Sequence, residues 1–129
     1  MKPTTAEWAA KAEGDYCTSR RELAVQESPN YDAVAFHAQQ CAEKYLKARL
    51  IEADVAFPKT HDFSKVLDLV VQLEPAWENL RPQLEALTDL GVEVRYPSAF
   101  ADDEDASGAL ETAHQVRQLV RKSLGLECD

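Results

Sequence analysis

Apolar residues recur at intervals of three and four along most of the chain, and alternation with a period of two is nearly absent. Such spacing gathers apolar side chains on one face of a helix, so the pattern predicts an all-α protein. Four main helices are predicted: from about Thr5 to Gln26, from about Tyr31 to Ala53, from Thr60 or Asp62 to near Leu73, and from about Glu104 to Leu124. A short helix containing Leu80, Leu84, Leu87 and Leu90 is predicted between the third and the last of them. We expect an up-and-down bundle of four main helices plus a short helix, in one domain spanning residues 1–129.

The pattern defines the apolar faces of the first two helices and one irregular segment. The first helix places Trp8, Ala12, Tyr16, Ser19 and Leu23 on one face, and the second places Val34, Ala38, Cys41, Ala42, Tyr45 and Ala48 on one face. Residues 91–105 lack periodicity and predict the longest loop. Residues 102–105, at the end of this loop, are all acidic. We expect them to stabilise the N-terminus of the last helix rather than to form an acidic ligand site.

Polar residues mark the starts of the second and third helices. Asn30 or Asp32 would cap the second helix, because their side chains accept hydrogen bonds from free backbone N–H groups. Thr60, His61 and Asp62 would serve the N-terminus of the third helix in the same way.

Composition and charge narrow the possible functions. The 129 residues are 45% hydrophobic and 29% charged, which indicates a globular core rather than a disordered chain. Acidic residues outnumber Lys and Arg by 23 to 14, which gives a formal net charge of −9. This charge excludes the class of proteins that bind nucleic acid through a strongly basic surface. Any RNA or nucleotide site must therefore be a local basic patch.

Cysteine usage and the N-terminal sequence point to the cytoplasm. The three cysteines, Cys17, Cys41 and Cys128, show no CxxC spacing, so we expect neither a disulfide framework nor a zinc site. His37 and Cys41 lie four apart on one helix, but no further metal ligand is near in sequence, and we expect both to be partly buried packing residues. The sequence shows no signal peptide and no run of roughly 20 apolar residues, so no membrane association is expected.

Three segments carry a recognisable pattern. They are FHAQQCAEKYLKA at residues 36–48, FPKTHDF at residues 57–63 and VRYP at residues 94–97. In this order and spacing they resemble the HEPN family (higher eukaryotes and prokaryotes nucleotide-binding domain), and the resemblance extends from about Trp8 to Leu124. It implies a helical bundle that forms a homodimer and pairs with a minimal nucleotidyltransferase, often as toxin and antitoxin. No cofactor is expected.

Many HEPN proteins are metal-independent ribonucleases, so the resemblance also implies where a catalytic pair would lie. An Arg holds the scissile phosphate, and a His separated from it by four to six residues moves a proton at the ribose 2′-hydroxyl. Arg95 matches the Arg, but the positions for the His hold Phe100, Ala101 and Asp102. Because Phe cannot transfer a proton, we expect little or no ribonuclease activity. The alternative is a ribonuclease with an altered site, in which His114 would be the first candidate for the missing group.

Arg95 has two interpretations that the residues leave open. It would bind an anionic ligand such as a nucleotide, or it would fix its loop by pairing with a carboxylate on a helix. Asp15 is the candidate partner, because it lies among apolar residues of the first helix and a carboxylate there needs a partner. We predict that Asp15 anchors Arg95. Tyr96 is expected to pack in the bundle, although its ring would also suit stacking on a base.

Two further groups of residues are candidates for binding. His114, Arg117 and Arg121 share one edge of the last helix, and they form either a solvated edge or a positive strip facing the Arg95 loop. Arg117 lies close to the apolar stripe of the last helix. A cation there either extends its charged end to solvent or pairs with a negative charge, which lies inside the bundle or on a partner protein. Phe36 and Ile51 lie on the polar side of the second helix, which indicates a protein interface and fits a homodimer.

Overall fold

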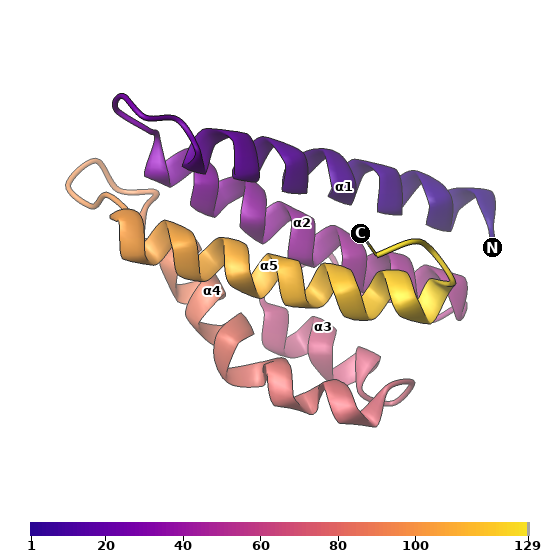
Figure 1. Cartoon of the computed structure of the whole chain (residues 1–129). Coiled ribbons are helices and arrows are strands. Elements are labelled where there is room, and N and C mark those ends of the chain that lie inside the picture. Colours follow the sequence, from indigo (N-terminus) through magenta and orange to yellow (C-terminus); the bar gives the residue numbers. More distant parts are fainter. Residues whose placement is uncertain (129) are drawn as a thin grey trace.

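The computed structural model describes residues 1–128, and the regular structure of these residues is entirely helical. It consists of α1 (Pro3–Leu23), α2 (Tyr31–Glu52), α3 (Phe63–Val70), a short 3-10 helix η1 (Pro75–Leu80), α4 (Arg81–Glu93) and α5 (Asp103–Leu124). In Figure 1, α1, α2 and α5 lie alongside one another, and α3 and α4 lie beneath them. The all-α bundle predicted from the periodicity is confirmed.

α2 is the central helix of the bundle. It packs against α1, α5, α3 and α4, and α1 and α4 lie on opposite sides of the layer that α2 and α5 form (Figure 1). The whole apolar stripe predicted for α2 is buried. Its small side chains let α1 approach closely, and the Ser19 hydroxyl on α1 donates a hydrogen bond of 2.8 Å to the backbone carbonyl of Val34.

The apolar face of α1 differs in part from the prediction. Ala12, Tyr16 and Ser19 are buried, but Trp8 and Leu23 are only half-buried. The Trp8 ring instead meets the ring of Phe57 edge to face, with ring centroids 6.3 Å apart. Because Phe57 belongs to the loop after α2, the spacing of residues within α1 does not reveal this contact.

Side chains cap three helices as the sequence indicates. Asn30 and Asp62 each accept a hydrogen bond from a backbone N–H in the first turn of α2 and α3. At the start of α5, Asp102 and Asp105 form a capping box, in which each side chain accepts from the other residue's backbone N–H. The acidic run before α5 therefore caps and stabilises that helix.

The irregular segment before α5 is shorter than predicted. α4 continues through Gly91 to Glu93, and α5 begins at Asp103, so only residues 94–102 form the loop. Leu90 and Val94 pack against the core at the end of α4, whereas Val92 on another face of this turn is exposed. The consequence for function is that Arg95 lies directly after the C-terminal turn of a helix.

A buried ion pair joins α1 to α5. Arg117, which is 3% exposed, donates two hydrogen bonds to the carboxylate of Glu13, at 2.7 Å from Nε and 2.8 Å from Nη2. Tyr45 of α2 donates a further hydrogen bond to Glu13 at 2.6 Å, and its hydroxyl accepts one from Arg121 at 3.0 Å. The hydrogen bonds from Arg117 hold the pKa of Glu13 below its usual value, and burial raises the pKa of Tyr45. This cluster ties three helices together.

Candidate functional site

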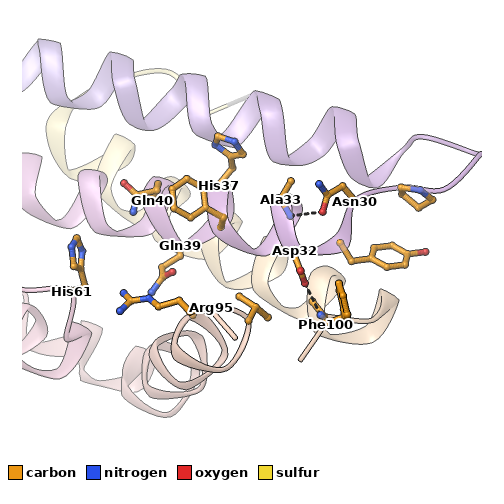
Figure 2. A pocket seen from close by; sticks show the side chains of 15 residues that line it. Asn30, Asp32, Ala33, His37, Gln39, Gln40, His61, Arg95 and Phe100 are labelled. Carbon is orange, nitrogen blue, oxygen red and sulfur yellow. Dashed lines mark hydrogen bonds between the residues drawn. The ribbon is translucent and has the colours of Figure 1, made fainter. Parts of the chain in front are cut away.

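A groove of about 940 Å³ lies between α2 and the segment formed by the end of α4 and the loop that follows it. We refer to it as the Arg95 groove, and Figure 2 shows it from close by. Its lining combines an arginine, two histidines, two glutamine amides and several aromatic rings. These residues include Tyr31, Phe36, His37, Gln39, Gln40, His61, Gly91, Val94, Arg95 and Phe100.

Arg95 supplies the positive charge of the groove. Its side chain is exposed and extends along the groove toward the end at which His61 lies (Figure 2). The guanidinium makes no hydrogen bond or ion pair with any residue between 1 and 128. The loop itself is held against the start of α2, because the Ala101 N–H donates a hydrogen bond of 2.7 Å to the Asp32 carboxylate. Arg95 thus offers its donors to a ligand from a fixed loop.

The predicted ion pair between Asp15 and Arg95 is wrong. The side chain of Asp15 is 12% exposed and binds two groups on α2, His37 Nδ1 at 2.8 Å and Lys44 Nζ at 2.6 Å. Asp15 is thus bound by α2, and none of the described residues that line the Arg95 groove belongs to α1, which lies on the other side of the α2–α5 layer from α4 (Figure 1). The sequence marks Asp15 correctly as a carboxylate that needs a partner, but the partners come from the neighbouring helix.

A second pair of carboxylate and histidine lies at one end of the Arg95 groove. His61 Nδ1 is 2.8 Å from Oε1 of Glu43, and Lys47 Nζ is 3.5 Å from the other carboxylate oxygen. Glu43 and Lys47 are buried, whereas the side chain of His61 is 65% exposed. At the start of α3, the backbone N–H groups donate to the side chains of Thr60, Asp62 and Thr88 and not to His61. His61 therefore serves the groove rather than the helix terminus expected from the sequence.

Glu43 lies in the motif at residues 36–48 and His61 in the motif at residues 57–63, and the position of Glu43 on its helix is a further signal for this pair. Glu43 lies on α2 directly between Ala42 and Lys44, and α2 buries residues on nearly all sides. A glutamate on such a helix requires a partner, because a buried unpaired carboxylate is costly. The identity of that partner is set by the path of the α2–α3 loop, which periodicity does not give.

Two glutamine amides form the wall of the groove between its ends. A Cβ atom at position 91 would lie 2.5 Å from the Gln39 carboxamide, so Gly91 leaves room for this amide beside α4. The side chains of Gln39 and Gln40 make no hydrogen bond within residues 1–128. An amide carries two donors and an acceptor, so both side chains are available to a polar ligand.

Two exposed aromatic rings, those of Phe36 and Phe100, line the groove. Phe100 occupies the first position at which the family's His would lie, and its side chain is 78% exposed. Figure 2 shows it at the opposite end of the groove from His61. Phe36 is also exposed and packs edge-on against His37, with ring centroids 5.2 Å apart. Tyr96 is exposed, so the expectation that it packs in the bundle is wrong.

The candidate binding residues of α5 lie outside the Arg95 groove. His114 Nδ1 is 2.9 Å from the Tyr16 hydroxyl on α1, Arg117 binds Glu13, and Arg121 reaches Tyr45. Among the described residues that line the Arg95 groove, none belongs to this edge of α5. The alternative of a positive strip facing the Arg95 loop is therefore wrong, because this edge of α5 faces α1. Of the alternatives for Arg117, the structure shows that it pairs with a charge inside the bundle, the partly buried carboxylate of Glu13.

Residues 1–128 contain no group of three or more His, Cys, Asp or Glu side chains placed to hold a metal ion. The thiol of Cys41 is buried, and this burial raises its pKa far above the usual range, so it is an inert packing group. In the same part of the chain, no helix combines the length and the apolar character that crossing a membrane requires.

The bundle and its groove define a small helical protein with a local basic site. Comparison with known proteins shows that the chain belongs to the HEPN family, since the family model described as "HEPN domain" matches residues 5–123. A protein of Methanocaldococcus jannaschii named "Putative toxin MJ1304" is 30% identical over 112 residues, a match that covers 74% of this chain and 73% of that protein. No solved structure matches at comparable significance. The family assignment made from the three motifs is confirmed.

Proposed function

We propose that this protein is a toxin-like HEPN subunit that binds single-stranded RNA in its Arg95 groove. The observation that carries the proposal is the exposed guanidinium of Arg95, which has no protein partner within residues 1–128. A guanidinium presents its N–H donors in a planar fork that matches phosphate oxygens. In a protein of net charge −9, such an unpaired cation is the local positive site that an RNA backbone requires.

The other groups of the groove favour RNA with unpaired bases over a simple anion. The amides of Gln39 and Gln40 are free to hydrogen-bond the edges of a base. The exposed ring of Phe100 lines the groove, and the ring of Tyr96 is exposed in the same loop; both suit stacking on a base face. Bases are accessible for both kinds of contact in single strands and loops, whereas a duplex hides them.

The proposal includes assembly with other chains. Phe36 is exposed on α2 beside the groove and would lie in a homodimer interface, whereas Ile51 is half-buried and would contribute at most its rim. A toxin-like protein needs an antitoxin partner, and in the HEPN family a minimal nucleotidyltransferase fills that place. The name of the M. jannaschii relative supports the toxin half of this pairing.

RNA binding is tested by fluorescence anisotropy of a labelled single-stranded RNA at low salt. Arg95→Ala should weaken binding by about tenfold or more, because hydrogen bonds to charged groups contribute about 1.5–3 kcal/mol. Arg21→Ala is the matched control, since Arg21 is exposed in the last turn of α1 and lies outside the groove. Equal affinities of the two variants would contradict the proposal.

A further inference from the structure

His61 is held in one orientation and one tautomer by a buried carboxylate. Its Nδ1 lies 2.8 Å from Oε1 of Glu43, and Glu43 is itself close to the ammonium of Lys47. A carboxylate only accepts hydrogen bonds, so Nδ1 carries the hydrogen and donates it to Glu43. Nε2 of the neutral ring then keeps its lone pair, as a general base must.

His61 and Arg95 reach the same groove from different walls. His61 comes from the loop between α2 and α3, and Arg95 from the loop after α4. Figure 2 shows the guanidinium of Arg95 on the side of the groove at which His61 lies, with Phe100 at the other end. A proton acceptor and a phosphate-binding group therefore face one cavity, although the Arg–His spacing of the family is broken in this sequence.

We propose that His61, positioned by Glu43, is the general base with which the Arg95 groove cleaves RNA without a metal ion. This inference rests on the proposed function, since RNA must first bind in the groove. It assigns catalysis to a histidine that lies before Arg95 in the sequence and outside the family's Arg–His pair. Glu43 contacts His61 and Lys47 and acts on the reaction only through His61, so it is a positioning residue.

The reaction is an internal transfer of the phosphodiester. Nε2 of His61 takes the proton of a ribose 2′-hydroxyl, and the 2′-oxygen forms a bond to the adjacent phosphorus. The bond from phosphorus to the 5′-oxygen of the next nucleotide breaks, and that oxygen takes a proton from water. Arg95 balances the charge that develops on the phosphoryl oxygens. The products are a 2′,3′-cyclic phosphate and a 5′-hydroxyl, and His61 returns its proton to solvent.

The other two histidines are placed for different tasks. His37 turns toward α1, where Asp15 binds its Nδ1, and its ring packs edge-on against Phe36 (Figure 2). His114 contacts Tyr16 on the α1 side of α5 and does not line the described groove. His114, the replacement that the sequence alone suggests, is therefore the matched control rather than the base.

The cleavage test uses the full chain, single-stranded RNA and excess EDTA. Wild type should give 2′,3′-cyclic phosphate ends and should leave a 2′-deoxy linkage intact. His61→Ala should lower the rate by about 10²- to 10⁴-fold, the usual contribution of a general base, and added imidazole should restore part of it. His61 is exposed, so this variant should fold normally. His114→Gln should cleave like wild type.

Three results separate this inference from the proposed function. Wild type that binds RNA through Arg95 but does not cleave it would overturn the inference and leave the proposed function intact. Cleavage by His61→Ala at the wild-type rate would do the same. Absence of any RNA binding would overturn the proposed function and the inference together.

The tautomer of His61 provides a measurement that is independent of activity. Nitrogen-15 NMR of the imidazole, at a pH where the ring is neutral, should show the hydrogen on Nδ1. The opposite tautomer, with the hydrogen on Nε2, would leave no lone pair facing the groove and would overturn the inference.

Discussion

The guanidinium of Arg117 on α5 and the carboxylate of Glu13 on α1 form an ion pair with two hydrogen bonds, at 2.7 and 2.8 Å. Arg117 is almost completely buried, so its charge is stabilised by protein groups, Glu13 among them, rather than by water. Tyr45 joins the pair from α2. This arrangement explains why α5 carries an arginine beside its apolar stripe, and it fixes the positions of three helices.

Removing either partner of this pair should destabilise the bundle to different extents. Glu13→Ala removes the carboxylate that accepts two hydrogen bonds from the buried guanidinium of Arg117, and it should cost about 3–5 kcal/mol in the free energy of unfolding. Arg117→Met should cost less, because the Glu13 side chain is partly exposed and regains water. The double variant should cost less than the sum of the single losses. Urea denaturation measures all three, and losses that are small and strictly additive would contradict the assignment.

The same ion pair should shape the stability of the protein in acid. Arg117 lowers the pKa of Glu13, so the stabilisation from Glu13 is complete above its usual pKa and is lost as the pH falls through the lowered value. The free energy of unfolding of wild type should therefore fall more steeply between about pH 5 and pH 3 than that of Glu13→Gln. Urea denaturation at a series of pH values checks this, and parallel curves would show that Glu13 makes no such contribution.

Asp15 and Arg95 should differ sharply in their effects on stability. Asp15→Ala removes the acceptor for His37 and Lys44 and should cost about 1–3 kcal/mol. Arg95→Ala removes an exposed side chain without a protein partner and should change stability by less than about 0.5 kcal/mol. Thermal and urea unfolding compare the two. If Arg95→Ala were as destabilising as Asp15→Ala, the guanidinium would be held by the bundle after all.

Phe36 should take part in self-association. Light scattering at concentrations on the order of tens of micromolar should give the mass of a homodimer for wild type, and Phe36→Asp should shift the mass toward that of a monomer. Val25→Asp serves as the control, because Val25 is also exposed but lies in the loop after α1, outside the Arg95 groove. A clean monomer for wild type would contradict the proposed dimer.

The fold was largely predictable because local rules decide most of it. The α2 stripe from Val34 to Ala48 follows helical periodicity and is buried as expected. The caps at Asn30 and Asp62 follow from the chemistry of their side chains. The three motifs then supplied the family, which the match to residues 5–123 confirms.

The site was predictable only in part, because periodicity tells which face of a helix is buried but not which helix lies opposite. Asp15 was correctly marked as needing a partner, yet its partners lie on α2 rather than in the Arg95 loop. For the same reason the sequence leaves open whether the His114 edge of α5 is solvated or faces the Arg95 loop, whereas the structure places His114 against Tyr16 of α1. The contact between Glu43 and His61 depends on the path of a loop, which no local rule fixes.

RNA binding in the Arg95 groove is measured most directly by chemical-shift changes of the nitrogen-15-labelled protein on addition of a short single-stranded RNA. We predict the largest changes at the side-chain amides of Gln39 and Gln40 and in the backbone around Arg95, with little change along the His114 edge of α5. Changes confined to that edge of α5, or an unchanged groove at high RNA concentration, would contradict RNA binding in the Arg95 groove.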